Sequence, residues 1–375
     1  MAKILYALSG ANRGHTSRVL AITEDLRARG HQIIFCGGGR ALEILEELGE
    51  TVLPVPAIQQ VMDGNRVRLG RTFLQNVPNY LFRPSIWRKL LPKVEAFGPD
   101  LVVSDFETYA ARAARRLGVP VLSFNHQQVV TETRYEVPRR FWLEAMLTRS
   151  AINSIVPRRP EHILVSSFFF PEVKDPSRTT LIKPIIRRAV QRARPEKGAH
   201  TLVYLNQPEG AGKLLETLRA VDAPFVVYGF EPPAGDERWG NLLFRKPSME
   251  GFLDDLATSR SVICTAGYTL LSEALYLGKP MLVWPNKGTF EQTINALYLE
   301  RDGLGEAVYH RPIEVADVSG FLSRVEQYEV RLPFRSAYGN DMAVGHIEEI
   351  LRRSGALEPA RTRRAVAVGA QIQAA

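Results

Sequence analysis

The sequence predicts an α/β protein made of two doubly wound, Rossmann-like domains that face a central cleft. The first observation is the length, because 375 residues exceed the usual limit of a single hydrophobic core. The second is the alternation of short apolar runs with helical patterns, which is typical of parallel sheets with crossover helices. The third is a charged, proline-flanked interruption at 184–199, after which the alternation starts again.

The N-terminal domain is predicted over residues 1–185. Its expected strands, all rich in apolar residues, are 3–9, 31–38, 51–57, 100–105, 119–125 and 162–168. Its expected helices, all with apolar residues at helical spacing, are 17–29, 40–48, 108–117 and 138–155. Gly30 is placed to end the first helix as a C-cap. Residues 59–95, rich in aromatic and basic side chains, are expected to be partly helical.

A linker is predicted at 186–198, followed by a C-terminal domain at 199–345. The expected strands of that domain are 201–206, 225–230, 241–246, 261–267 and 280–285. Its expected helices are 210–220, 248–257, 270–277 and 290–300. Residues 346–375 are expected to form a C-terminal helix and a disordered tail, since the Ala-, Arg- and Gln-rich end has little to bury.

Composition excludes several classes of protein. No run of about 18 apolar residues occurs, so no transmembrane helix is expected. The N-terminal run MAKILYALSG is too short for a secretory signal and is expected to be a buried strand. The cysteines are Cys36 and Cys264, which excludes a disulfide framework or a cysteine zinc site and favours a reducing cytoplasm.

The net charge of +8 is unevenly distributed. Residues 1–198 carry 30 basic and 18 acidic side chains, a net +12, whereas residues 199–375 carry 18 and 22, a net −4. A basic half indicates an anionic partner, such as a membrane surface or a phosphate-bearing acceptor. The alternative is an arginine-rich surface without a partner. Nucleic acid is not expected because no recognition motif accompanies the charge, and nothing specifies an oligomeric state.

The stretch 261–305 predicts a nucleotide-sugar site. Gly267 lies where a strand ends, and Thr269, Ser272 and Glu273 surround the start of the next helix. Backbone amides at a helix N-terminus bind phosphate, and a carboxylate can accept hydrogen bonds from two sugar hydroxyls.

Glu291 and Gln292 follow the next strand of that stretch. Ligands of doubly wound sheets bind beyond the carboxyl ends of the strands, so we expect this pair at the same edge as Gly267. The alternative is that both residues only begin a helix.

Candidate catalytic residues follow strands of the N-terminal half. His15 comes after the first strand and a loop that ends at Gly14, and histidine suits general-base chemistry near neutral pH. Asp105 ends the strand 100–105, where its carboxylate can orient the imidazole of His15. The alternatives are a capping role for His15 and an N-cap role for Asp105. Glu107 is the weaker alternative base.

Asn125 and His126 end a further strand and are candidates for contacts with the acceptor. The segment 138–155 predicts a helix with Trp142 and Met146 beside its apolar face and arginines around it. Such a helix fits a membrane interface or simply packs on the sheet of its own domain. The aromatic and basic mixture at 80–93 allows the same two interpretations.

Taken together, these residues resemble the GT-B glycosyltransferases. The C-terminal half resembles MurG-type family 28 enzymes most, and residues 1–350 resemble an uncharacterised prokaryotic group with a GHxSR start and a DFE strand end. The resemblance places Gly14 and His15 on the family's glycine-histidine loop and Asp105 on the aspartate that partners the histidine. It implies that Gly267 and Glu273 are the donor-site glycine and the ribose-binding glutamate.

The resemblance also assigns Glu291 and Gln292 to the donor sugar, and Phe252 and Leu253 to the nucleobase. Thr265-Ala266 departs from the pattern, because many members have a phosphate-binding histidine there. Arg245, Lys246 and backbone amides, including those near Gly210, are expected to neutralise the phosphates instead.

The expected function is that of a metal-independent, inverting glycosyltransferase. It would move a sugar from a UDP-sugar to an acceptor hydroxyl, with no cofactor and no metal, since no Asp-x-Asp motif occurs. One option for the acceptor is a lipid or lipid-linked molecule, with the cytoplasmic enzyme peripheral on the inner face of the membrane. The alternatives are a UDP-sugar 2-epimerase, a nucleotide-sugar hydrolase, and a non-enzymatic nucleotide-sugar-binding protein.

Overall fold

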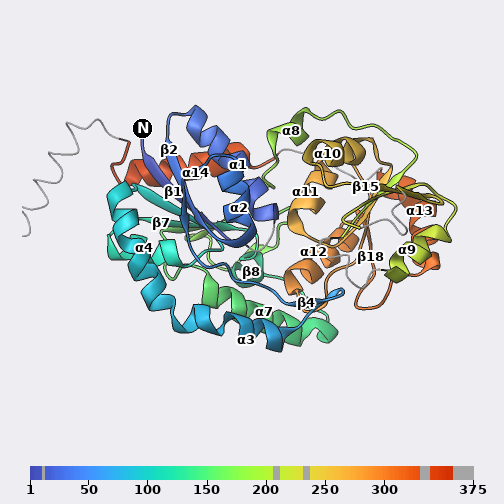
Figure 1. Cartoon of the computed structure of the whole chain (residues 1–375), viewed down its shortest axis with the longest axis horizontal. Helices are drawn as coiled ribbons and strands as arrows, with labels where there is room; N and C mark the ends of the chain where they lie inside the picture. Colours follow the sequence, from blue (N-terminus) through green and yellow to red (C-terminus); the bar gives the residue numbers. More distant parts are fainter. Residues whose placement is uncertain (11–12, 206–211, 231–236, 330–337, 358–375) are drawn as a thin grey trace, which may run out of the picture.

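The computed structural model describes residues 1–10, 13–205, 212–230, 237–329 and 338–357. They form two domains side by side, each built around a seven-stranded sheet with helices on both faces (Figure 1). The predicted α/β class with two doubly wound domains is confirmed.

The N-terminal sheet is parallel throughout. Its strands are β1 (Lys3–Leu8), β2 (Gln32–Gly37), β3 (Val52–Pro54), β6 (Leu101–Asp105), β7 (Val121–Asn125), β9 (His162–Ser166) and β11 (Thr179–Ile182). Their order is β11-β9-β7-β6-β1-β2-β3, which places β1, β6 and β7 at the centre. Because these three are neighbours, the residues that follow them meet at one edge. The strand β11 was not predicted.

Helices cover this sheet and extend beyond it. They are α1 (Arg13–Ala28), α2 (Gly39–Glu47), α3 (Leu69–Leu81), α4 (Arg83–Phe97), α5 (Tyr109–Arg116), α6 (Val129–Glu132), the 3-10 turn η1 (Arg139–Phe141) and α7 (Trp142–Ile155). The helix α1 begins at Arg13 rather than at the predicted Ser17, so His15 lies in its first turn. Gly30 has a φ of 84°, as its predicted position after the helix requires.

Two small two-stranded ribbons lie outside the main sheet of this domain. One is the hairpin of β4 (Met62–Asp63) and β5 (Arg66–Val67), and the other pairs β8 (Thr133–Arg134) with β10 (Glu172–Val173). The loops after β1 and β2 approach so closely that a Cβ on Gly10 would lie 1.8 Å from the Gly38 carbonyl oxygen. Glycine is therefore required at Gly10 for the first strand to lead into α1.

The C-terminal sheet has the order β14-β15-β13-β12-β16-β17-β18, and only its β14–β15 edge is antiparallel. Its strands are β12 (Thr201–Tyr204), β13 (Phe225–Tyr228), β14 (Arg238–Trp239), β15 (Leu242–Arg245), β16 (Ser261–Cys264), β17 (Met281–Val283) and β18 (Gly305–Ala307). The helices are α8 (Arg188–Arg192), α9 (Gly212–Arg219), α10 (Met249–Thr258), α11 (Tyr268–Tyr276), α12 (Phe290–Arg301) and α13 (Val315–Glu329).

The chain crosses between the domains twice. The predicted linker 186–198 contains α8, whose Val190 is buried in the C-terminal core. The last helix, α14 (Asn340–Arg353), returns to the N-terminal domain, where its apolar face packs in the core with β1 (Figure 1). Asn340 joins the two crossings, since its Oδ1 accepts from the Ile186 amide at 3.0 Å and its Nδ2 donates to the Ile186 carbonyl at 3.1 Å. The return therefore begins before the predicted boundary at 345, and the tail predicted after 357 lies outside the described residues.

Candidate active site

A cleft of about 2050 Å³ separates the two domains and is lined by both. The predicted residues that line it are Gly14, His15, Phe252, Gly267, Thr269, Glu273, Glu291 and Gln292. They come from the start of α1 on one side and from α10, α11 and α12 on the other. Residues distant in sequence thus meet at one cavity, as the strand ends predict.

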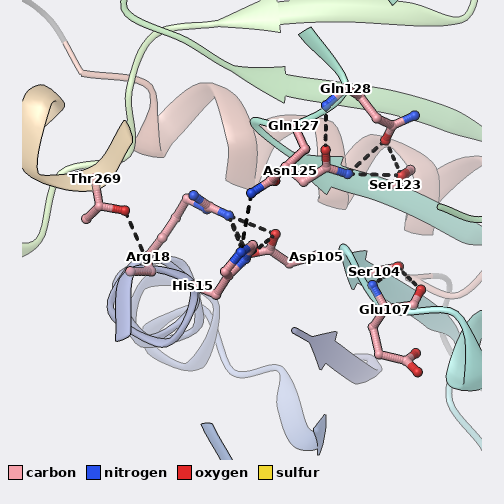
Figure 2. A network of polar contacts seen from close by, with 11 residues as sticks. His15, Arg18, Ser104, Asp105, Glu107, Ser123, Asn125, Gln127, Gln128 and Thr269 are labelled. Carbon is pink, nitrogen blue, oxygen red and sulfur yellow. Dashed lines mark hydrogen bonds and ion pairs between the residues drawn. The ribbon is translucent and has the colours of Figure 1, made fainter. Parts of the chain in front are cut away.

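His15 and Asp105 are in direct contact at the N-terminal wall. His15 Nδ1 lies 3.0 Å from Asp105 Oδ1, and both side chains are buried (Figure 2). The contact follows from the sheet, because Asp105 pairs in register with Leu8 at the end of β1. When Nδ1 donates its hydrogen to Asp105, Nε2 keeps a lone pair that can accept a proton.

Arg18 is a third member of this group. Its Nη2 donates to both oxygens of Asp105, at 2.8 and 2.7 Å, and its side chain is 4% exposed. Burial by itself would raise the pKa of Asp105, but the charges of Arg18 and His15 outweigh it and lower that pKa. Asp105 is therefore held as a carboxylate.

Arg18 was not predicted as a site residue. The available signal was its position three residues after His15, which places both side chains on one face of α1. Its guanidinium also lies over the Tyr268 ring, 5.5 Å from the centroid, so it contacts the other domain.

Two further residues surround the imidazole. Gln127, which follows β7, places its Nε2 3.3 Å from His15 Nε2, the ring nitrogen that does not contact Asp105 (Figure 2). The Phe106 ring stacks near the imidazole, with centroids 6.4 Å apart and an interplanar angle of 17°. Phe106 has a φ of 59°, a strained conformation for a bulky residue that turns the chain sharply after Asp105. Both residues line the cleft, and neither was predicted.

The first turn of α11 forms the opposite wall. Gly267 is the N-cap residue, so the first amides of α11 point toward the cleft. Thr269 Oγ1 donates to the Gly14 carbonyl oxygen at 3.3 Å, which brings the first turns of α1 and α11 together. The Ser272 hydroxyl donates to the Tyr268 carbonyl of its own helix at 2.8 Å and lies behind the cleft surface.

Glu273 is bound by an arginine of the linker. Arg187 donates to its two carboxylate oxygens through Nε at 2.7 Å and Nη2 at 2.8 Å, and both residues line the cleft. The glutamate side chain is 4% exposed, so the guanidinium compensates a buried charge. From the sequence, Arg187 was predicted only as part of a charged linker.

Comparison with known proteins agrees with this architecture. The sequence profile described as glycosyl transferase family 1 matches residues 2–326. The chain belongs to this family of glycosyltransferases.

Two curated relatives of this glycosyltransferase match along most of its length. An uncharacterised glycosyltransferase of Methanosarcina acetivorans is 27% identical, over 81% of this chain and 83% of the relative. A Cellvibrio japonicus protein, named UDP-N-acetylglucosamine--N-acetylmuramyl-(pentapeptide) pyrophosphoryl-undecaprenol N-acetylglucosamine transferase, is 25% identical over 85% and 88%.

Solved structures confirm the GT-B fold. The glycotransferase of kitacinnamycin superposes with a TM-score of 0.65 and 20% identity, covering 93% of this chain and 99% of its own. Acinetobacter baumannii MurG superposes with a TM-score of 0.61 and 15% identity, covering 92% and 99%. The fold predicted from the resemblance is thus the fold of this enzyme.

The three acceptor-side candidates of the glycosyltransferase have partners outside the cleft. Glu107 accepts from the amides of Tyr109 at 2.6 Å and Ala110 at 2.9 Å, so it caps α5. Burial raises the pKa of Glu107 to about 7, despite those amides, which lower it. Asn125 Nδ2 donates to Gln128 Oε1 at 2.8 Å, and its Oδ1 accepts from the Gln128 amide at 2.9 Å (Figure 2).

His126 lies at the domain interface. Its ring stacks on Tyr268 at 3.9 Å between centroids, and its Nε2 lies 2.8 Å from Asn295 Oδ1 in α12. Asn295 Nδ2 donates to the Ala266 carbonyl, which fixes the orientation of that amide. Burial lowers the pKa of His126. In this conformation the residue joins the domains, and its neighbour Gln127 faces the cleft instead.

The predicted nucleobase and phosphate residues lie in three different places: the cleft, the core and the exposed surface. Phe252 lines the cleft, with the rings of Tyr204 and Tyr228 edge-on to it at 5.3 and 5.1 Å. Leu253 is buried in the core behind it. Arg245 and Lys246, which were predicted to neutralise the phosphates, are exposed and are not among the residues that line the cleft, and Arg245 lies 3.4 Å from Asp255. The loop around Gly210 lies outside the described residues.

Proposed function

We propose that this glycosyltransferase transfers a sugar from a UDP-sugar to an acceptor hydroxyl, with inversion at the anomeric carbon and without a metal ion. The observation that carries the proposal is the His15–Asp105 contact at the wall that faces the N-terminus of α11. A proton acceptor and an anion-binding helix end, on opposite sides of one cleft, suit a single displacement between two bound substrates.

In this reaction His15 Nε2 takes the proton of the acceptor hydroxyl. The hydroxyl oxygen forms a bond with the anomeric carbon while the bond from that carbon to the diphosphate oxygen breaks. The diphosphate leaves with the electron pair, and the amides at the start of α11 stabilise its charge. Asp105 stabilises the imidazolium that forms, and Arg18 keeps Asp105 ionised.

The C-terminal residues supply the proposed donor site. Glu273 would accept hydrogen bonds from the ribose, Phe252 would contact the base, and Glu291 and Gln292 would hold the sugar. The name of the Cellvibrio relative specifies a UDP-sugar donor, which supports uracil as the base.

The direct test combines product analysis with substitution of the base. The wild-type enzyme, supplied with a UDP-sugar and an acceptor, should release UDP and form a glycoside of opposite anomeric configuration, also with EDTA present. His15→Ala should bind UDP as the wild type does and lose about 10²–10⁴-fold in turnover. Wild-type turnover in His15→Ala would contradict the assignment. Free sugar or an isomerised UDP-sugar as the sole product would indicate hydrolase or epimerase activity instead.

We further propose that the acceptor is a lipid or lipid-linked molecule at a membrane surface. Exposed apolar side chains concentrate on α3 and α7, two helices that both contribute to the lining of the cleft: Phe73, Leu74, Leu81, Trp142, Leu143, Met146 and Leu147. Three exposed arginines lie in α3, in η1 just before α7, and in α7: Arg71, Arg139 and Arg149. Phe73, Leu143 and Leu147 also line the cleft, so an apolar acceptor could reach His15 from this surface.

Among the described residues, no helix is long and apolar enough to cross a bilayer. Surface association is therefore tested with vesicles. The enzyme should co-sediment with vesicles that contain anionic lipid more than with neutral ones, and Trp142→Ser with Leu143→Ser should reduce this. Equal sedimentation with both kinds of vesicle would contradict a basic membrane-binding surface.

A further inference from the structure

The loop that leads to Glu291 and Gln292 belongs to the C-terminal domain. It comprises residues 284–289, between β17 and α12. Its own domain holds it through Trp284, whose amide donates to the Cys264 carbonyl at 2.8 Å, and through Gln292 Oε1, which accepts from the Asn286 amide at 2.9 Å. The position of Gln292 is thereby tied to the conformation of the loop.

The hairpin β4–β5 of the N-terminal domain pairs with this loop. The Lys287 amide donates to the Asn65 carbonyl at 2.8 Å, and the Val67 amide donates to the Lys287 carbonyl at 2.8 Å. Asn65 Nδ2 also donates to the Pro285 carbonyl at 3.2 Å. In Figure 1 the hairpin extends from its own domain toward α12. The loop thus has strand-like pairing with a segment about 220 residues away in sequence.

Glu144 of α7 binds the next part of the loop. Its Oε1 accepts from the Gly288 amide at 3.0 Å and lies 3.4 Å from the Thr293 hydroxyl. Its Oε2 lies 3.6 Å from His310 Nε2. The glutamate side chain is 14% exposed, so these contacts are largely shielded from water. Gly288 has a φ of 89°, which favours glycine, and a Cβ there would make a tight contact of 3.3 Å with the Val67 Cβ where the hairpin crosses the loop.

The backbone of the sugar-facing loop is therefore held by the domain opposite its own. Asn65 and Glu144 form hydrogen bonds with backbone groups of the loop that would otherwise bond to water. The hairpin β4–β5 and α7, which carry these residues, both line the cleft close to the loop. The nucleotide is assigned to α10 and α11, which the hairpin and α7 do not hold. Binding of the sugar should therefore depend on the hairpin and α7, and binding of the nucleotide should not.

We propose that Asn65 and Glu144 are positioning residues for the sugar of the donor: they fix the loop 284–289 from the acceptor-side domain, and through it Glu291 and Gln292. The inference rests on the proposed donor site. It follows that the affinity contributed by the sugar depends on the contacts of Asn65 and Glu144 with this loop, whereas nucleotide affinity does not depend on them.

The test compares UDP with a UDP-sugar by calorimetry, using the UDP-sugar that stabilises the wild type most in a thermal-shift screen. In Glu144→Ala and Asn65→Ala, UDP should bind as it does to the wild type. The additional affinity of the UDP-sugar over UDP should fall about tenfold in each, the size expected for one lost hydrogen bond to a well-ordered group. The donor KM should rise accordingly.

Glu144→Gln retains an oxygen for the Gly288 amide and should recover most of that affinity. Glu172→Ala, an exposed glutamate outside the cleft, is the matched control. An unchanged difference between UDP and UDP-sugar in both alanine variants would overturn the positioning role, and so would an equal loss for both ligands. A wild-type enzyme that binds no UDP and no UDP-sugar would instead overturn the proposed function.

Discussion

Arg18 donates to both carboxylate oxygens of Asp105, the same carboxylate that His15 Nδ1 contacts at 3.0 Å. The aspartate therefore has two basic neighbours, and each is connected with a different role of the carboxylate. His15 makes it part of a proton-transfer pair, and Arg18 keeps it charged although it is buried. Stability and chemistry depend on the same side chain, but through different partners.

The proposed role of Asp105 in proton transfer is tested by Asp105→Asn. The amide can still occupy the site, but it has no charge to stabilise an imidazolium, and its NH₂ group favours the wrong tautomer of His15. Turnover should fall by about 10²–10⁴-fold while UDP affinity stays at the wild-type value. Steady-state kinetics and UDP calorimetry provide the two measurements. A variant that keeps more than half of its turnover would show that Asp105 only maintains the fold.

The contribution of the Arg18–Asp105 pair to stability is tested by Arg18→Met. Removing the guanidinium leaves a buried carboxylate without its main partner, so the unfolding free energy should fall by about 3–5 kcal/mol at pH 7. The lowered pKa of Asp105 stabilises the fold above the pKa of the unfolded chain, and this is lost as pH falls through the folded value. Urea unfolding of the variant should therefore show a smaller loss of stability between neutral and acidic pH than the wild type.

Arg29→Met is the control for that measurement. Arg29 pairs with Glu348 on the surface, where its side chain is 46% exposed. Exposed pairs contribute little, so the change should stay within about 1 kcal/mol. If both arginine variants lost the same stability, burial of the Arg18–Asp105 pair would not be the reason for its effect.

Arg187→Ala should weaken nucleotide binding. Glu273 would keep its buried position without a compensating cation, and its carboxylate would no longer be fixed by two hydrogen bonds. Affinity for UDP should fall about tenfold or more, by calorimetry, because the ribose contact is proposed to need that carboxylate. Arg194→Ala, an exposed linker arginine, should leave it unchanged. Equal UDP affinity in Arg187→Ala and the wild type would separate Glu273 from the donor.

Glu107 predicts a pH dependence of stability. Its pKa in the folded protein is raised to about 7, above the value for an unfolded chain, so the folded state holds a proton that the unfolded state releases. Protonated Glu107 therefore contributes up to about 3 kcal/mol to the free energy of unfolding. This contribution is complete below about pH 4.5 and is lost as the pH rises through about 7. Glu107→Gln should lack this loss, so the wild type should become relatively less stable between pH 5 and 7.5. Parallel curves for the two proteins across that interval would contradict it.

The sequence by itself specified most of the sheet strands and the candidate residues at their ends. Buried strands such as β6 and β7 are runs of apolar residues flanked by turn signals, and parallel strands place their carboxyl ends at one edge. This was enough to predict that His15 faces Gly267, Glu273 and Glu291 across a cleft, with Asp105 beside it at the end of β6.

Only the tertiary structure decided which polar neighbours complete those sites. Arg18, Gln127 and Arg187 contact Asp105, His15 and Glu273, which lie on other elements. The spacing of residues within one helix or strand does not reveal contacts between elements. Glu107 and Asp105 are two residues apart and chemically alike, yet the turn at Phe106 sends one to cap α5 and the other to His15. Periodicity reports which side of an element is buried, whereas pairing depends on how distant elements pack.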